Sequence, residues 1–309
     1  MITEIGLFLE PGAGPSARLQ GPLPWQYRAI AEWWPELVSS DAQTRRLQRF
    51  VAHGGSPALE VGFGSGERVL ACRRAGIDID GVEPSPELFA AARERFARLG
   101  ESTHRLYWQP LHEIELPRRY ASVYMGRGLG ASANAAFDAL ALLRLYRALE
   151  PGGMLLLEQP SPASRLSRWA SWFGPAQRAP ELGPHFVQDG RGRERLELSV
   201  QAVRYSAARG TVSFTACARH YDGGALRVAH REACRQRLYT PREIRELLRR
   251  AGFDARRIHG RYSPEAQRWL WWAEKVGSSR SDTPLVTPRA PGALELAAVA
   301  GLRYGGAGW

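Results

Sequence analysis

A glycine-rich turn between a short apolar strand and a helical pattern has the residue types and spacing to bind a ligand. The predicted strand is Ala58–Val61, and Gly62, Gly64 and Gly66 follow it at alternate positions. Glycine carries no Cβ and tolerates positive φ, so the backbone of such a turn can approach a bound group closely. The first amides of the next helix have no partner within that helix and can bind the same ligand.

The second predicted strand ends at an acidic residue, Glu83, whose carboxylate could bind the hydroxyls of a sugar. The stretch from Gly76 runs to Glu83, after which Ser85 and Pro86 predict the start of a helix that Gly100 ends. A carboxylate at this place can accept hydrogen bonds from both hydroxyls of a ribose, as the corresponding acid does in dinucleotide-binding folds. The alternative for Glu83 is a solvated carboxylate at a strand end.

The spacing of the glycines disfavours two other kinds of binding turn. The dinucleotide fingerprint needs G-x-G-x-x-G, whereas the third glycine arrives one residue early here. A Walker loop would end in Gly-Lys-Ser or Gly-Lys-Thr, and this turn does not. Hydride chemistry and a phosphate-cradling loop are therefore both disfavoured.

Three stretches, taken in order, resemble one family of enzymes. Leu-Glu-Val-Gly-Phe-Gly-Ser-Gly at 59–66 resembles the first motif of class I S-adenosylmethionine-dependent methyltransferases, in which an acid precedes G-x-G-x-G. Leu-Glu-Pro-Gly-Gly at 149–153 resembles the connection to their fifth strand. Tyr-Thr-Pro-Arg-Glu at 239–243, with Leu-Leu-x-x-Ala-Gly-Phe at 247–253, is similar to the segment that returns small-molecule members to the core sheet.

The resemblance implies a fold, a cofactor and a set of binding residues. The fold would be α/β, with a doubly wound, Rossmann-like, mostly parallel sheet of seven strands and an inserted antiparallel β cap. The cofactor would be S-adenosylmethionine, with Glu83 at its ribose. The positions that match the cofactor site of the family are Glu60, Gly62, Gly64, Gly66, Glu83, Pro84, Leu111 and Gly126.

One expected cofactor contact is missing. The family usually places an Asp soon after the third strand, here Arg105–Trp108, where it meets the adenine amino group. That position falls at Gln109 and Pro110 in this chain. Either His112 or Glu113 takes over this contact, or backbone and apolar contacts hold the adenine.

The pattern along the chain predicts a core interrupted by a cap. We expect a flexible N-terminal arm at 1–24, the core with the cofactor site at 25–159, the cap at 160–238, the rest of the core at 239–276 and a disordered tail at 277–309. Period-two alternation and turn signals predict cap strands at Glu194–Tyr205, Thr211–His220 and Ala225–Tyr239. The last core strands are predicted at Phe253–Ile258 and Gln267–Val276.

Methyl transfer depends on holding the acceptor in line with the methyl group, and it needs a general base only where the nucleophile arrives protonated. Tyr27 lies in a stretch that resembles the N-terminal helix that closes over the cofactor, Arg127 is the charged residue of the loop after the fourth strand, and His220 lies on a cap strand. These three are the candidate catalytic residues. Packing or solvent exposure is the alternative explanation for each.

Composition limits the remaining possibilities. The chain has 309 residues, a formal net charge of +11 and three cysteines, Cys72, Cys217 and Cys234, without metal spacing. The arginines are scattered rather than gathered into one tract, which disfavours a nucleic-acid partner. No long apolar run predicts a membrane span, and the cysteine usage favours a reducing, cytoplasmic location. No metal site is expected.

The sequence thus favours an enzyme that transfers a methyl group from S-adenosylmethionine to N or O of a small-molecule acceptor. Two alternatives stay open. A non-catalytic protein that binds S-adenosylmethionine or S-adenosylhomocysteine would fit the missing acid near Pro110, and methylation of RNA or protein would fit the positive charge. The acceptor, the methylated atom and the oligomeric state are not predicted.

Overall fold

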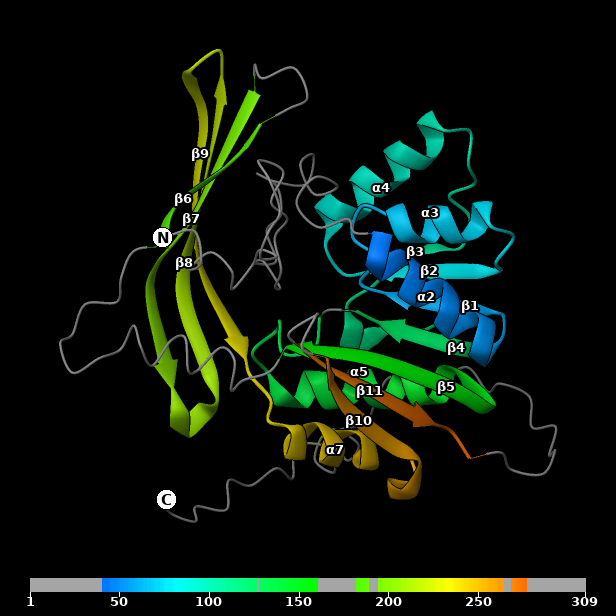
Figure 1. Ribbon diagram of the computed structural model, residues 1–309. Helices are drawn as coiled ribbons and strands as arrows, with labels where there is room; N and C mark the ends of the chain where they lie inside the picture. The colour runs from blue at the N-terminus through cyan, green and yellow to red at the C-terminus, as the bar shows by residue number, and fades with distance from the viewer. Residues whose placement is uncertain (1–40, 127, 161–181, 189–193, 264–267, 277–309) are drawn as a thin grey trace.

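Two β-sheets organise the part of the chain that the structure describes. The structure is a computed structural model, and its described residues are 41–126, 128–160, 182–188, 194–263 and 268–276 (Figure 1). One sheet has seven strands and the other has four. The predicted arm at 1–24 and tail at 277–309 lie outside the described residues, and the domain boundaries stay predictions.

The seven-stranded sheet is mostly parallel. In chain order its strands are β1 (Ala58–Val61), β2 (Ile79–Glu83), β3 (Leu106–Trp108), β4 (Tyr120–Met125), β5 (Leu149–Pro160), β10 (Ile258–Ser263) and β11 (Arg268–Glu274). Across the sheet the order is β10-β11-β5-β4-β1-β2-β3, and only the pairs β5-β11 and β11-β10 are antiparallel. The strand order reverses at β1, between β4 and β2, where open α/β sheets bind their ligands beyond the carboxyl ends of the strands.

Helices cover both faces of this sheet (Figure 1). One face packs against α2 (Asp41–Gly54), α3 (Glu67–Arg74) and α4 (Pro86–Arg98), and the other against α5 (Ala135–Ala148) and α7 (Pro241–Arg250). Three short 3-10 turns are also described: η3 (Leu111–Glu113) and η5 (Ala255–Arg257) belong to this part of the chain, and η4 (Ala207–Arg209) belongs to the second sheet. A mostly parallel sheet between two helical layers confirms the predicted fold class.

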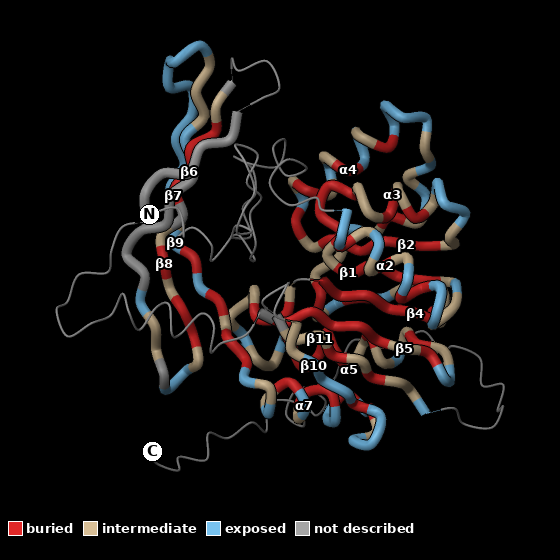
Figure 2. Tube along the Cα trace, viewed as in Figure 1, coloured by how far each residue is buried: buried red, intermediate tan, exposed pale blue. Residues whose placement is uncertain are grey.

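The strands supply two hydrophobic cores, one for each face. Leu155 and Leu157 of β5 pack with α5 and α7, whereas Leu156 packs with α2 and α3. This division follows from the alternation of side chains along a strand. Leu47 and Phe50, which helical spacing predicts to face inward, are buried in the core beneath α2. Figure 2 shows the buried residues as a continuous band along the central strands.

Side chains cap the N-termini of α4 and α7. The Ser85 hydroxyl accepts a 3.2 Å hydrogen bond from the Leu88 amide at the start of α4. Thr240 and Glu243 form a reciprocal capping box at the start of α7. Each cap satisfies amides that have no partner inside the helix, so both helix starts are fixed by local sequence.

The second sheet is an antiparallel cap beside the core (Figure 1). It comprises β6 (Leu182–Gln188), β7 (Glu194–Ser206), β8 (Thr211–Asp222) and β9 (Ala225–Arg237), which lie in this order. The strands β7, β8 and β9 agree closely with the predicted meander. The strand β6 was not predicted, because it lies within a stretch at 160–190 that is rich in Pro, Gly, Ser and Arg, a composition that favours loops.

The inner end of the cap is fastened to the core. The Arg237 amide donates a 2.8 Å hydrogen bond to the Gly130 carbonyl in the loop after β4. The Tyr239 hydroxyl donates a 2.6 Å hydrogen bond to Oδ2 of Asp138 on α5, and the Gly130 amide donates to Oδ1 of the same residue. A Cβ on Gly130 would lie 2.2 Å from the Arg237 carbonyl oxygen, so this contact requires glycine. These contacts therefore fix the position of the inner end of the cap relative to the loop after β4 and to α5.

Two core strands differ from their predicted limits. The predicted strand at Phe253–Ile258 is wrong: β10 begins at Ile258, because Asp254 caps a 3-10 turn through a 2.9 Å hydrogen bond from the Arg256 amide. The Pro-Gly-Gly turn is part of β5, where it produces a register shift against β4.

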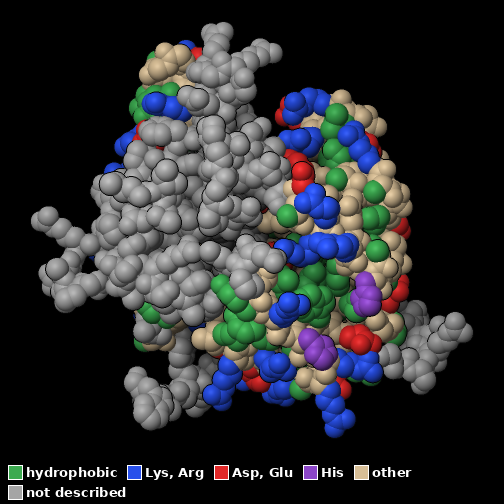
Figure 3. Space-filling view, in the orientation of Figure 1, with side chains coloured by type: hydrophobic (Ala, Val, Ile, Leu, Met, Phe, Trp, Pro, Cys, Tyr) green, Lys and Arg blue, Asp and Glu red, His purple; other side chains and the backbone are tan. Residues whose placement is uncertain are grey.

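Charged side chains of both signs are mixed with apolar ones on the face of the core that Figure 3 shows. Among the described helices, none is long and apolar enough to cross a membrane. Within the same residues, no group of three or more His, Cys, Asp or Glu side chains could hold a metal ion.

Candidate functional site

The glycine turn forms an arch of positive-φ residues at the carboxyl end of β1. Gly62, Gly64 and Gly66 have φ of 72°, 65° and 85°, which L side chains rarely adopt. The arch is held by a 2.8 Å hydrogen bond from the Gly62 amide to the Val82 carbonyl. A Cβ on Gly66 would lie 2.8 Å from the Phe96 ring, so glycine is also required by packing. The helix α3 begins directly after Gly66, and no side chain caps it.

Glu83 joins this arch to the start of α4. Its Oε2 accepts a 2.8 Å hydrogen bond from the Gly64 amide, and its Oε1 accepts a 2.9 Å hydrogen bond from the Ser85 amide. An ionised carboxylate offers about four lone-pair sites, so each oxygen can accept one further donor. Two neighbouring hydroxyls of a ribose are a donor pair of that kind.

Burial raises the pKa of Glu83 to about 7, against the two backbone hydrogen bonds, which lower it. The side chain is almost wholly enclosed, so ionisation loses the stabilisation that water would give. The carboxylate therefore gains from any further donor that a ligand brings. The interpretation of Glu83 as a solvated strand end is wrong, because only 3% of the residue is exposed.

Glu60 is a second buried carboxylate on β1. Its Oε1 accepts hydrogen bonds from the Arg68 guanidinium of α3, whereas its Oε2 is buried and has no hydrogen-bond partner. Burial raises the pKa of Glu60 to about 7, although Arg68 acts in the opposite direction. A buried acceptor without a partner is costly, so Oε2 has capacity for a cationic or N–H donor from a ligand.

The missing acid after β3 is replaced by a closed loop. The Gln109 amide group donates 2.8 Å to the Glu115 carbonyl and accepts 2.8 Å from the Glu115 amide, so it is not available to a ligand. The His112 ring stacks on Phe137, with ring centroids 4.0 Å apart. Leu111 is buried.

The sequence analysis did not identify Trp108, which lies at the end of β3. It pairs with Glu83 across β2 and β3, and its indole Nε1 donates a 3.2 Å hydrogen bond to the Pro84 carbonyl. The side chain is 58% exposed, so a large apolar ring lies at the surface next to Glu83. Its place at the end of the third strand is the sequence signal that could have identified it.

The loop after β4 forms another side of the same edge. Gly126 follows β4, and a Cβ there would lie 3.0 Å from the Tyr124 ring. The Tyr124 hydroxyl donates a 2.7 Å hydrogen bond to Glu158, which also accepts one from Arg46 of α2. Burial and the Glu158 charge raise the pKa of Tyr124 well above its usual value, so its hydroxyl stays protonated as a donor.

Of the three candidate catalytic residues, the structure describes one, His220. Tyr27 and Arg127 lie outside the described residues. His220 lies toward the outer end of β8, where it pairs with Leu196 of β7, whereas β8 begins at the junction with the core. The described geometry thus brings Glu60, Gly62, Gly64, Gly66, Glu83, Pro84 and Gly126 to one edge of the sheet, with Leu111 in the loop beyond β3, and leaves His220 on the cap.

These residues fit S-adenosylmethionine in two respects. The arch from Gly62 to Gly66 leaves no side chain at the three positions where the backbone turns, so a ligand can lie against the main chain. Two buried carboxylates, Glu60 and Glu83, keep acceptor capacity for the ammonium group and the ribose hydroxyls of that molecule.

Comparisons with known proteins agree with this geometry. Residues 39–258 match the family model described as a methyltransferase domain. A curated relative, a trans-aconitate 2-methyltransferase from Methylobacterium radiotolerans, is 28% identical over 179 residues, which cover 50% of this chain and 64% of the relative. The match therefore spans less than two thirds of that protein.

Two solved structures share the fold. One is an S-adenosylmethionine-dependent methyltransferase from Clostridium acetobutylicum, with a TM-score of 0.59, 14% identity, and coverage of 81% of this chain and 99% of the other. The second is an amino pentose methyltransferase from Micromonospora echinaspora with S-adenosylmethionine bound, with a TM-score of 0.58, 18% identity, and coverage of 82% and 99%. At such identities these likenesses concern the fold alone.

Proposed function

Because the chain belongs to the methyltransferase domain family, we propose that it transfers a methyl group from S-adenosylmethionine to nitrogen or oxygen of a small-molecule acceptor. The family match confirms the prediction, made from the sequence, that the chain is a class I S-adenosylmethionine-dependent methyltransferase. The acceptor, the methylated atom and the roles of single residues belong to the proposal.

The observation that carries the cofactor part of this proposal is the position of Glu83. Its two oxygens bridge the glycine arch and the start of α4, and the carboxylate keeps capacity for two more donors. In the proposed complex, Glu83 binds the ribose hydroxyls, Glu60 binds the ammonium group, and Gly62 to Gly66 let the ligand lie against the backbone.

S-adenosylmethionine supplies an electrophilic methyl group on a sulfonium. The protein then has to hold the acceptor in line with that group and exclude water, which is catalysis by positioning. The loop that begins at Gly126 lies at the switch in strand order, where it can form one wall of the acceptor site. Tyr27 and Arg127 stay proposed as residues that orient the donor or the acceptor, and His220 as a weaker one.

A small-molecule acceptor is supported by the names of the similar proteins. The curated relative is named for trans-aconitate, and the Micromonospora echinaspora structure is named for an amino pentose. The cap, which meets the core beside the loop after β4, offers walls for an acceptor of that size.

The proposal is tested by incubating the purified protein with methyl-labelled S-adenosylmethionine and panels of small amines, phenols and carboxylic acids. Mass spectrometry should find a labelled product whose rate of formation at a limiting concentration of the donor falls roughly tenfold or more with Glu83→Gln. Binding of S-adenosylhomocysteine without transfer to any panel member or to an extract would instead favour a non-catalytic binding protein. Strongly salt-dependent retention on RNA would favour a macromolecular acceptor.

A further inference from the structure

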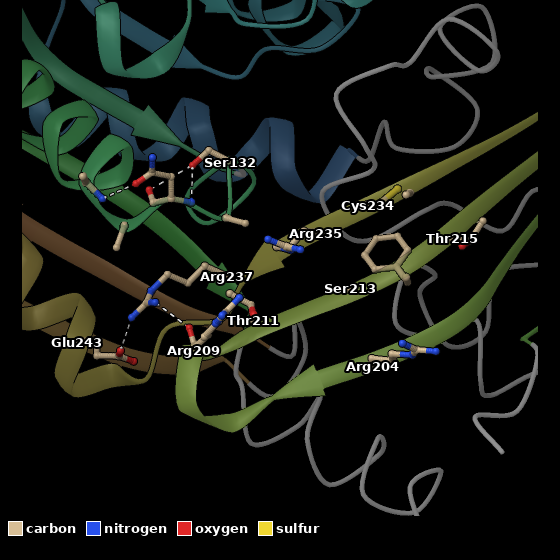
Figure 4. Close-up of a pocket in the computed structure, with 16 residues that line it drawn as sticks. Ser132, Arg204, Arg209, Thr211, Ser213, Thr215, Cys234, Arg235, Arg237 and Glu243 are labelled. Carbon is tan, nitrogen blue, oxygen red and sulfur yellow. Dashed lines mark hydrogen bonds and ion pairs between the residues drawn. The ribbon is translucent and has the colours of Figure 1, made fainter. Parts of the chain in front are cut away.

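A pocket at the junction of cap and core is lined by arginines (Figure 4). Its volume is about 1110 Å³, which is large enough for a small molecule. The wall on the core side is the segment 132–136, which leads into α5. The wall on the cap side comes from η4 and the inner ends of β7, β8 and β9, and it includes Arg204, Arg209, Arg235 and Arg237.

Three of the lining residues form one row across the cap sheet. Arg204 of β7 is paired with Ser213 of β8, and Ser213 is paired with Arg235 of β9. Direct partners in an antiparallel sheet project from the same face, about 5 Å apart at Cβ. Ser213 therefore lies between the two arginines in this row. We call Arg204, Ser213 and Arg235 the arginine row.

The next row toward the core repeats the arrangement. Thr211 of β8 is paired with Arg237 of β9, two residues along each strand from the arginine row. Because side chains alternate along a strand, these two lie on the same face. Arg237 also donates a 2.8 Å hydrogen bond to the Arg209 carbonyl, which fixes η4 against this end of the pocket.

The positive charge of this pocket is not balanced from within. Glu243 is the acid of its lining, and it is already occupied by Arg237 at 3.0 Å and by the Thr240 amide at 2.8 Å. Arg204, Arg209 and Arg235 pair with no acid in the described part of the chain. Neighbouring guanidinium groups without an acid repel one another, and a bound anion would remove that repulsion.

Arginines further out on the cap behave differently. Arg219 pairs with Glu197 at 2.6 Å, and Arg227 pairs with Asp222 at 2.9 Å. Within the described part of the cap, these two outer arginines thus have acid partners, whereas Arg204, Arg209 and Arg235 at the pocket have none. This contrast separates the pocket from the general excess of arginine.

We propose that the pocket binds an anionic group, a carboxylate or a phosphate, of the methyl acceptor, and that the arginine row is its principal contact. This assignment names the acceptor class and rests on the proposed methyl transfer. Guanidinium groups donate paired hydrogen bonds to the oxygens of both anions, and the hydroxyls of Ser213 and Thr211 can donate to the same group.

The test uses citrate and inorganic pyrophosphate as probes, titrated by calorimetry into the full-length protein saturated with S-adenosylhomocysteine. At least one probe should bind, and added salt should weaken the binding. Tighter binding of citrate would identify a carboxylate acceptor, and tighter binding of pyrophosphate a phosphate acceptor. The double variant Arg204→Gln/Arg235→Gln should lose at least about tenfold in affinity for that probe.

The control is Arg256→Gln, which removes one charge from an exposed arginine of η5 on the core. It should leave the affinity for the probe unchanged. Arg235→Lys, which keeps the charge but loses the planar fork, should give an intermediate loss and covers the case in which the double variant does not fold.

The proposal is overturned if neither probe binds the wild type, or if the folded double variant binds as tightly as the wild type does. Failure of methyl transfer is recognised separately, because it would leave the wild type binding the probes while no acceptor is methylated. Among acceptors that do react, an acid should be preferred to its neutral amide, and the double variant should reduce that preference.

Discussion

The Gly64 amide and the Glu83 carboxylate are joined by a 2.8 Å hydrogen bond that links the first two strands of the sheet at their carboxyl ends. The bond ties the conformation of the glycine arch to the position of the acid that we assign to the ribose. A substitution at either Gly64 or Glu83 should therefore disturb the position of the other residue.

Glu83→Gln keeps the shape of the side chain but removes the charge and replaces one acceptor by a donor. The affinity for S-adenosylhomocysteine, measured by calorimetry, should fall by about 1.5–3 kcal/mol, or roughly ten- to hundredfold, the range for hydrogen bonds to charged groups. Glu94→Gln on the exposed face of α4 is the matched control and should leave the affinity unchanged.

A double-mutant cycle makes this prediction specific to the ribose. A cofactor analogue without the ribose 2′-hydroxyl should bind the wild type weakly, and Glu83→Gln should then lose little more, because both changes remove one interaction. Strictly additive losses would show that Glu83 does not contact the ribose.

Gly64→Val should abolish cofactor binding while the protein stays folded. The φ of 65° strains any branched side chain, and the Cβ would stand in the arch where a ligand approaches the backbone. Gly100→Val is a close control, because Gly100 has a φ of 67° and open space around a Cβ. Both variants should lose about 1–2 kcal/mol of stability. Calorimetry should find that only Gly100→Val still binds S-adenosylhomocysteine.

Tyr239→Phe should loosen the junction of cap and core. The change removes the 2.6 Å hydrogen bond to Asp138, a buried carboxylate whose one remaining hydrogen-bond partner among the described residues is then the Gly130 amide. The free energy of unfolding, measured with urea, should fall by about 1–3 kcal/mol. Tyr262→Phe on β10, where the ring is only partly buried, should cost much less. Equal losses in both variants would contradict this account of the junction.

The elements around the cofactor edge could be predicted because their signals are local. The glycine spacing, the acid at Glu83 and the caps at Ser85 and Thr240 each depend on residues close in sequence, and the structure agrees with them. The strand β10 could not be placed, because the capping of η5 by Asp254 displaced it.

The features that were missed depend on contacts between distant residues. Trp108 is exposed on β3, which is the edge strand of the sheet, and the strand β6 is defined by its pairing with β7. The arginine row exists only because the register of β7, β8 and β9 brings its members together. A one-residue slip would turn each strand's side chains to the opposite face, and sequence alone does not fix that register.

Cofactor affinity and the stability of the free protein should depend on pH in opposite directions, because both depend on the protonation of Glu83. Burial raises the pKa of Glu83 to about 7, above the value near 4.5 of an exposed Glu. The folded protein therefore holds a proton that the unfolded chain has released between these two values. The contribution of Glu83 to stability is complete below about pH 4.5 and is lost as the pH rises through about 7.

Binding of ribose hydroxyls needs the ionised carboxylate, so the affinity for S-adenosylhomocysteine should rise up to about tenfold per pH unit below about pH 7 and level off above it. Urea unfolding and calorimetry from about pH 5 to about pH 8 measure the two slopes. Glu83→Gln has no proton to exchange at this position, so its affinity and its stability should both change less with pH than those of the wild type. A variant that keeps both wild-type slopes would assign the titration to another group, of which Glu60, with its pKa raised to about 7, is the first to test.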